Sequence, residues 1–91
     1  MKQAKTILYS VSVVLPNWNG MGLLRKNLPS IVRACPSCQI IVADDASIDG
    51  SVEMLQKEFP TVEIVANKTQ LGFSGNVNSG VARATGEVVI L

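Results

Sequence analysis

The sequence predicts an α/β fold, a Rossmann-like parallel sheet of four strands in the order 3-2-1-4 with helices on both faces. Short apolar runs alternate with stretches of helical spacing along residues 11–91, which is the pattern of repeated βα units. Two of the runs change abruptly into polar residues, as buried strands do where their carboxyl ends open into loops. Right-handed crossovers then place a binding crevice over the first strand, where the strand order reverses.

The first βα unit covers residues 11–34. The run from Val11 to Leu15 is rich in β-branched residues and predicts a buried strand. Because proline cannot continue a central strand, residues 16–20 are expected to form a loop. Apolar residues at helical spacing predict an amphipathic helix from Met21 to Ala34, and Pro29 inside it predicts a kink or a late start.

The remaining elements repeat this alternation. We expect strands over residues 39–43, 62–66 and 87–91, a second helix over 51–59 and a third over 73–84. The third helix is rich in small residues. Because glycine costs roughly 1 kcal/mol in a helix relative to alanine, Gly75 and Gly80 indicate close approach by the sheet or by a ligand.

Composition bounds the possible functions. The chain has 91 residues, 47% of them hydrophobic, a net charge of +1 and no histidine. It is therefore one small domain or part of a larger one, with no electrostatic case for nucleic acid. The apolar segment at residues 7–15 is too short to span a membrane and lacks a signal-peptide cleavage site, so a cytoplasmic location is the default. An apolar fourth strand at a sheet edge invites pairing, so we expect a homodimer through it, or that the chain is the front half of a longer protein.

Two cysteines, Cys35 and Cys38, are separated by Pro36 and Ser37. A structural zinc site needs four ligands, and the sequence has no other cysteine and no histidine. A thioredoxin-type pair lies at a helix N-terminus, whereas this pair is expected between a helix and the next strand. We therefore expect the cysteines to pack in a loop without a redox or metal role.

Acidic residues follow the second strand. Asp44 and Asp45 lie at the strand end and are candidates for ligand binding. Asp49 is interpreted as a cap of the next helix, since aspartate is a favoured capping residue. The expected loops at this edge also carry Trp18, the only tryptophan, which we place near the surface because asparagines flank it.

An aromatic ring, a carboxylate and a helix N-terminus together suit a nucleotide. The ring can stack on a base, the carboxylate can accept an N–H from uracil or guanine, and the helix start near Ser74 can face phosphate. Neither a G-x-G-x-x-G motif nor a P-loop motif is present, which excludes those two classes of nucleotide site. The candidate binding residues are Pro16, Asn17, Trp18, Asp44, Asp45, Gly72 and Asn78.

Four segments resemble the start of inverting family-2 glycosyltransferases with the A-type fold. They are V-S-V-V-L-P-N-W-N at residues 11–19, I-V-A-D-D-A-S-I-D-G-S at 41–51, the segment 67–80 with its Asn and Gly residues, and G-E-V-V-I-L at 86–91. The sequence of residues 72–78 is most similar to that of rhamnosyl- and galactofuranosyl-type members. The resemblance implies that Pro16 and Trp18 flank a uracil or thymine ring. It also implies that Asp44 reads the base, that Asp45 can share or take over that role, and that Asn78 lies over the donor pocket.

The resemblance also implies what residues 1–91 lack. In the family, a D-x-D motif after the fourth strand binds a divalent metal, Mg or Mn, and a later acid is the catalytic base. We therefore expect a partial nucleotide-sugar-binding domain that is inactive alone, with no catalytic residue and no metal ligand of its own. Its parent would transfer sugar from a UDP- or dTDP-sugar to a glycan, lipid or other acceptor, as in cell-wall or polysaccharide biosynthesis, in the cytoplasm or in association with a membrane. The alternatives are a receiver-like signalling module, which would carry its acids after the first strand, and a nucleotidyltransferase.

Overall fold

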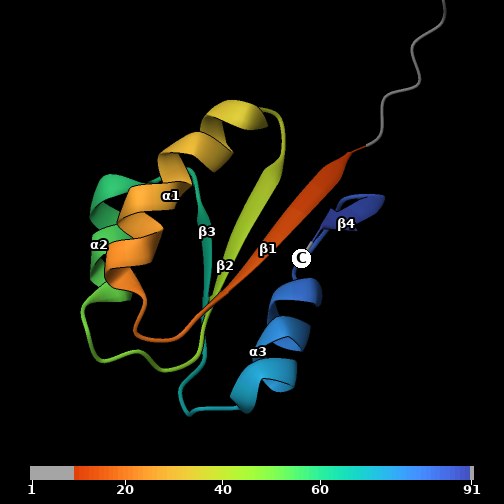
Figure 1. Ribbon diagram of the computed structural model, residues 1–91. Helices are drawn as coiled ribbons and strands as arrows, with labels where there is room; N and C mark the ends of the chain where they lie inside the picture. The colour runs from red at the N-terminus through yellow and green to blue at the C-terminus, as the bar shows by residue number, and fades with distance from the viewer. Residues whose placement is uncertain (1–9, 91) are drawn as a thin grey trace, which may run out of the picture.

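Four parallel strands form one sheet in the order β3-β2-β1-β4, with helices on both faces (Figure 1). The computed structural model describes residues 10–90. This arrangement confirms the predicted fold class and strand order. The elements in chain order are β1 (Val11–Asn17), α1 (Met21–Ala34), β2 (Gln39–Asp44), α2 (Ser51–Glu58), β3 (Glu63–Ala66), α3 (Gly72–Val81) and β4 (Val88–Ile90).

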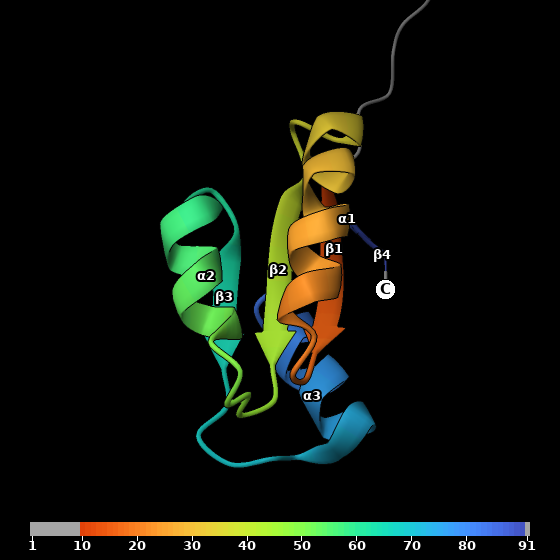
Figure 2. The same ribbon diagram turned by 60° about the vertical axis from the view of Figure 1, so that its left-hand side comes forward.

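The main hydrophobic core lies between the sheet and the pair of helices α1 and α2, which cover the same face (Figure 2). Leu28 of α1 and Leu55 of α2 are fully buried, and they belong to one cluster with Ile40 and Val42 of β2. Burying a side chain of this size contributes about 1.5–3 kcal/mol. These residues therefore fix the two helices on the sheet.

The other face of the sheet is covered by α3, which approaches β1 and β2 closely. A Cβ atom added to Gly80 would lie 2.5 Å from Val14 Cγ1 and 3.1 Å from the Ala43 Cβ atom. The predicted close approach of the sheet is therefore confirmed at Gly80. At Gly75 an added Cβ would instead meet the Leu71 side chain, at 2.8 Å.

The first strand is longer than predicted, because β1 continues through Pro16 to Asn17. Pro16 is in register with Ala43 of β2, and the Asn17 carbonyl accepts a 2.9 Å hydrogen bond from the Asp45 N–H. The other neighbour, β4, pairs only with Val11–Val13 in the described part of the chain. Among the described residues, Pro16 therefore has a strand partner on one side only, and a sheet tolerates proline at such a position.

All three helices differ from the prediction, and α2 ends at Glu58 rather than Phe59 while α3 begins at Gly72 rather than Phe73. The late start expected for α1 is wrong: the helix begins at Met21, and the Leu24 N–H bonds to the Gly20 carbonyl at 2.9 Å. Pro29 lies inside this helix. The third helix ends at Val81 rather than Ala84. Beyond it, the N–H groups of Arg83 and Ala84 bond three residues back, at 3.0 Å each, which tightens the chain into turns.

The turn between α1 and β2 contains a disulfide between Cys35 and Cys38. The backbone supports this turn, because the Cys35 N–H bonds to the Ile31 carbonyl and the Cys38 N–H to the Cys35 carbonyl, both at 3.1 Å. Cys38 also packs against the hydrophobic core. The expectation of loop packing agrees with that contact, but the covalent pairing was not predicted.

Other expectations concern the ends of the chain. Residues 1–9 and Leu91, the last residue of the predicted fourth strand, lie outside the described residues. No helix within residues 10–90 is long and apolar enough to cross a membrane. Because β4 pairs only with β1 in the part of the chain that the structure describes, it is an edge strand there. A homodimer through β4 stays a prediction.

Candidate functional site

A cavity of about 250 Å³ opens at the carboxyl edge of the sheet, between the end of β1 and the start of α3. Its position is the crevice predicted over the first strand. Three of its lining residues, Gln70, Phe73 and Asn76, were not predicted. The predicted site residues that the cavity does bring together are Pro16, Asn17, Trp18, Asp45 and Gly72.

Among the described residues that line this cavity, Asp45 alone carries an ionisable group, its carboxylate. One oxygen, Oδ1, accepts hydrogen bonds from the Leu71 N–H at 2.8 Å and from Asn67 Nδ2 at 3.1 Å. The other, Oδ2, accepts one from the Gly72 N–H at 3.0 Å. The Leu71 hydrogen bond is the main reason that the pKa of Asp45 lies below its ordinary value. Burial opposes that effect, and the bonds from Asn67 and Gly72 add to it.

Two asparagines, Asn67 and Asn76, form a hydrogen-bond chain that positions this carboxylate. Asn67 Nδ2 donates to Asp45 and also to Asn76 Oδ1, at 2.9 Å. Asn76 Nδ2 in turn donates to the Ala43 carbonyl at 2.9 Å, and Asn76 is only 3% exposed. The two amide groups thus link α3 to β2 and fix the direction in which Asp45 points.

Asp44 is placed differently from its predicted role. It is buried and lines neither of the cavities described here. Its Oδ1 accepts from Asn17 Nδ2 at 2.8 Å and from the Ser47 hydroxyl at 2.7 Å, and its Oδ2 accepts from the Ser47 N–H at 2.9 Å. Asp44 therefore ties the loop after β2 to the end of β1. These contacts do not favour its predicted role in reading the base, which stays a prediction.

The strand pleat explains why the two acids differ. Successive side chains of a strand point to opposite faces, and β2 extends to Asp44. Ile40 and Val42 belong to the core under α1 and α2, whereas Ala43 lies against Gly80 of α3. Asp44 therefore continues the face of Val42, and Asp45 continues the face of Ala43, where the cavity lies.

Asn78 also departs from its predicted place. It is exposed on α3 and lines neither cavity, whereas Asn76 is buried and lines the one beside Asp45. Helix residues four apart share a face. Asn76 and Gly80 therefore lie on the side of α3 that faces the sheet, and Asn78 lies outside it. This spacing is the sequence signal that identifies Asn76.

Asp49 has the capping role predicted for it, and it serves two helices. Its Oδ1 accepts from the N–H and the hydroxyl of Ser51 at the start of α2, and its Oδ2 accepts from the Met21 N–H of α1 at 3.0 Å. The Ser51 hydroxyl and then the Met21 N–H lower the pKa of Asp49.

At the start of α3, the N–H groups of Leu71 and Gly72 donate hydrogen bonds to Asp45. These two N–H groups are therefore engaged by the protein itself, and the phosphate site expected near Ser74 stays a prediction.

A family model supports the assignment that this geometry suggests. The model described as Glycosyl transferase family 2 matches residues 12–91. The chain belongs to glycosyl transferase family 2. Membership in this family decides against the receiver-like and nucleotidyltransferase alternatives.

Two relatives of this family-2 chain are glycosyltransferases by name. A GalNAc(5)-diNAcBac-PP-undecaprenol beta-1,3-glucosyltransferase of Campylobacter jejuni is 36% identical over 84 residues, which is 87% of this chain and 27% of the relative. An uncharacterised glycosyltransferase of Nostoc is 32% identical over 83 residues, 87% of this chain and 26% of the relative. The chain thus spans about a quarter of these relatives' length. The rhamnosyl or galactofuranosyl subtype stays a prediction.

Solved structures of glycosyltransferases share the fold. A mannosyltransferase from Pyrobaculum calidifontis, in complex with GDP-Man and Mn²⁺, has a TM-score of 0.77 at 26% identity over 92% of this chain and 27% of its own. Staphylococcus aureus TarS has a TM-score of 0.75 at 23% identity over 88% of this chain and 26% of its own. The likeness to TarS concerns the fold alone.

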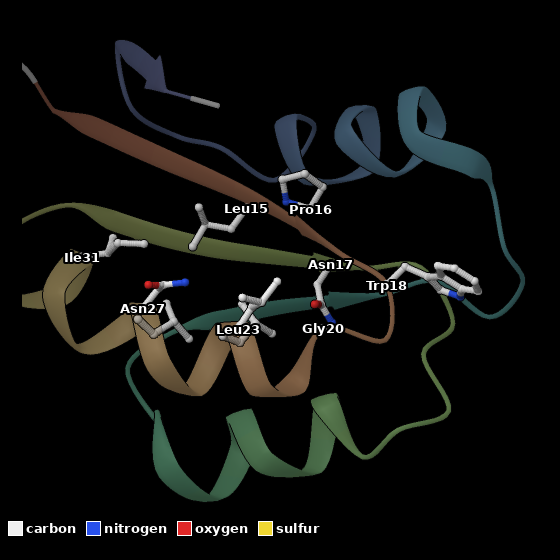
Figure 3. Close-up of a pocket in the computed structure, with 10 residues that line it drawn as sticks. Leu15, Pro16, Asn17, Trp18, Gly20, Leu23, Asn27 and Ile31 are labelled. Atoms are coloured by element: carbon white, nitrogen blue, oxygen red, sulfur yellow. The ribbon is translucent and has the colours of Figure 1, made fainter.

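The family-2 chain carries a second, larger cavity on the other side of β1 (Figure 3). It measures about 370 Å³ and lies between β1 and α1, with Leu15, Leu23 and Ile31 in its wall. It shares Pro16, Asn17 and Trp18 with the cavity beside Asp45. Because none of its lining residues in the range 10–90 is ionisable, this second cavity offers no counterpart there to the Asp45 carboxylate.

The residues present do not fit a metal ion. Within residues 10–90, no three His, Cys, Asp or Glu side chains gather in a way that could hold one. The carboxylate oxygens of Asp44, Asp45 and Asp49 all accept hydrogen bonds from N–H or O–H donors instead. No step of the chemistry is therefore derived through a metal at these residues.

Proposed function

We propose that this chain supplies the nucleotide-binding part of an inverting glycosyltransferase that takes its sugar from a UDP- or dTDP-sugar. The observation that carries the proposal is the Asp45 carboxylate in the wall of the cavity, beside Trp18 and Gly72. Family membership supports the reaction class. The acceptor of the whole protein, in this proposal, is a glycan or a lipid-linked glycan, as the name of the Campylobacter relative indicates for that enzyme.

Asp45, rather than Asp44, is the residue that we assign to the base. Each carboxylate oxygen offers about two acceptor positions. Oδ1 of Asp45 receives two donors from the protein and Oδ2 receives one. One acceptor position on Oδ2 is therefore available to a ligand, on a side chain that lines the cavity.

An ionised carboxylate selects bases that present a donor. The lowered pKa keeps Asp45 ionised near neutral pH, so that it can only accept hydrogen bonds. Uracil and thymine present an imide N–H at N3, which can complete the fourth acceptor position. Cytosine presents a lone pair there, which the carboxylate repels. Guanine also presents an N–H, so the preference for UDP or dTDP over GDP rests on the family resemblance alone.

The whole protein, in this proposal, uses a divalent metal that binds the donor diphosphate. The Pyrobaculum mannosyltransferase is in complex with GDP-Man and Mn²⁺, which supports metal use among its structural relatives. Mg²⁺ or Mn²⁺ would stabilise the leaving diphosphate as a Lewis acid. We expect the metal ligands and the catalytic base to lie outside residues 10–90. We also propose that the protein acts in the cytoplasm or at a membrane surface.

Nucleotide binding is tested by titrating the 91-residue chain with UDP and with N3-methyl-UDP, by calorimetry and by the fluorescence of Trp18. We expect saturable binding of UDP and at least about tenfold weaker binding of the methylated analogue, because one charge-assisted hydrogen bond is lost. Asp45→Asn should bind UDP weakly, whereas Glu53→Gln, at an exposed position on α2, should bind it normally. Equal affinity for the two nucleotides would refute the assignment of Asp45 without depending on any variant's stability.

A second test concerns turnover. We expect the chain alone, with Mn²⁺ and radiolabelled UDP-sugars, to release no sugar above the protein-free rate, because the described residues hold no catalytic base in the cavity beyond the engaged Asp45. Robust sugar transfer by the isolated chain would contradict the proposal that it is only the nucleotide-binding part.

A further inference from the structure

Phe73 is a large apolar side chain that the fold leaves in solvent. It is 76% exposed, although it lies in the first turn of a helix whose next turn packs on the sheet. Burying a phenylalanine contributes favourable free energy to a fold, and Phe73 contributes little of it here. A single exposed apolar residue needs no explanation, but this one lines the cavity beside Asp45.

Trp18 is the second aromatic residue of that cavity. It is 57% exposed and follows the last residue of β1, whereas Phe73 comes from α3. The two side chains therefore reach one cavity from two elements that are far apart in the sequence. Asp45 lines the same cavity and reaches it from the loop after β2.

The position of Phe73 is coupled to Asp45. The two N–H groups that bond to the Asp45 carboxylate belong to Leu71 and Gly72, the residues immediately before Phe73. Gly72 has a φ of +83°, which only glycine adopts readily, and this turn sets the direction in which the chain enters α3. The backbone that carries Phe73 is thus fixed to the carboxylate that we assign to the base.

We propose that Phe73 and Trp18 form an aromatic pair that holds the base of the donor nucleotide by stacking. This inference rests on the proposed function and adds a binding residue to it. Aromatic side chains stack on any base, because every base has a π face, whereas a carboxylate distinguishes bases by their donors. The aromatic pair therefore supplies affinity for nucleotides in general, and Asp45 supplies the choice among them.

This division gives Phe73 a signature that a structural role lacks. Because the side chain is exposed, its truncation should leave the urea midpoint of unfolding unchanged. Loss of the Phe73 ring should weaken the binding of UDP and of N3-methyl-UDP by the same factor, so that the ratio of the two affinities stays as in the wild type. A substitution of Asp45 should instead change that ratio.

The experiment compares Phe73→Ala, Phe73→Leu and Phe73→Tyr by calorimetry with UDP. Ile48→Ala is the matched control, because Ile48 is 91% exposed and lines neither cavity. We expect about tenfold weaker binding for the alanine and leucine variants, and near wild-type binding for the tyrosine and Ile48 variants. Leucine retains apolar contact but has no π face. A loss of UDP affinity in Phe73→Leu therefore separates stacking from general hydrophobic contact.

Two results would overturn the inference, and they differ. If the wild-type chain binds UDP and Phe73→Leu binds it equally well, the aromatic pair is refuted while the nucleotide site stands. If the wild-type chain binds neither UDP nor its methylated analogue, the proposed function fails and the aromatic pair fails with it.

Discussion

The Asp45 carboxylate accepts a 3.0 Å hydrogen bond from the backbone N–H of Gly72, the first residue of α3. The side chain that immediately follows β2 thereby caps α3, which begins 27 residues later in the chain. Negative charge is favourable at a helix N-terminus. The residue that we assign to base recognition is therefore also part of the fold, and acid should affect it in both roles.

Acid should destabilise the chain through Asp45 and Asp49. Both pKa values are lowered from 3.8 in the folded state, by hydrogen bonds to Leu71 and to Ser51 in the first place. Their contribution to stability is therefore fully present above pH 3.8, and it is lost as the pH falls from there through the folded pKa values. Urea unfolding should therefore show a lower midpoint at pH 3 than at pH 4 and pH 7, with most of the fall below pH 4.

Substitution distinguishes the contribution of Asp45 and Asp49 to acid sensitivity from that of the other titratable groups. Asp45→Asn and Asp49→Asn should each unfold at lower urea at pH 7 and should lose less stability between pH 4 and pH 3 than the wild type. Glu53→Gln is the control at an exposed position. If both Asp variants retain the wild-type pH dependence, other groups cause it.

Gly80→Ala should destabilise the chain by about 1–3 kcal/mol, the usual cost of overpacking. The added Cβ would lie 2.5 Å from Val14 Cγ1 and 3.1 Å from the Ala43 Cβ, so α3 must move away from the sheet. Gly22→Ala is the matched control. At Gly22 the added Cβ would meet no atom within 4 Å apart from its chain neighbours and the nearby backbone of its own helix, and alanine should stabilise α1 by up to about 1 kcal/mol. Urea unfolding that ranks these two variants in the reverse order would disprove the close contact of α3.

Ala46 lies between Asp45 and Ser47 with a φ of +61°, a left-handed conformation that is unfavourable for alanine. Such a residue costs roughly 1–2 kcal/mol, part of which glycine recovers. Ala46→Gly should therefore raise the free energy of unfolding by up to about 1 kcal/mol, and Ala46→Val should lower it. Ala66→Gly in β3 is the control, where glycine should destabilise by about 0.5–1 kcal/mol. A destabilised Ala46→Gly variant would show that this loop adopts another conformation in solution.

Asn76→Ala should cost about 1–3 kcal/mol, because the buried Ala43 carbonyl and the amide of Asn67 both lose a partner. Asn78→Ala offers a control two residues away on the same helix, at an exposed position, and should change stability by less than about 0.5 kcal/mol. Thermal or urea unfolding measures both. An equal loss in the two variants would contradict the orientation of α3 described here.

Much of the fold could be predicted from the sequence, because each element has a local cause. Apolar runs and helical spacing predicted the alternation of elements, and the strand order followed from right-handed crossovers. The role of Asp49 also followed from a local rule, since capping depends on residues nearby in the sequence.

The candidate site could be predicted only in part, because its details depend on register. Ending β2 at Ala43 gave no reason to separate Asp44 from Asp45, whereas one further strand residue places them on opposite faces. The family resemblance favoured Asn78, whereas the spacing of four residues from Gly80 identifies Asn76 as the asparagine that faces the sheet. Phe73 was missed because no local pattern shows that an exposed side chain faces a cavity.

Reduction of the disulfide between Cys35 and Cys38 should destabilise the chain by about 2 kcal/mol or less. The bond closes a loop of only a few residues, and the loss of loop entropy in the unfolded chain grows with loop length. Urea unfolding with and without dithiothreitol should show this difference in the wild type and none in the double variant Cys35→Ser, Cys38→Ser. UDP binding should be the same in both buffers, because the disulfide lies between α1 and β2, at the opposite end of β2 from Asp45. A reductant-dependent affinity for UDP would show instead that this turn is coupled to the nucleotide site.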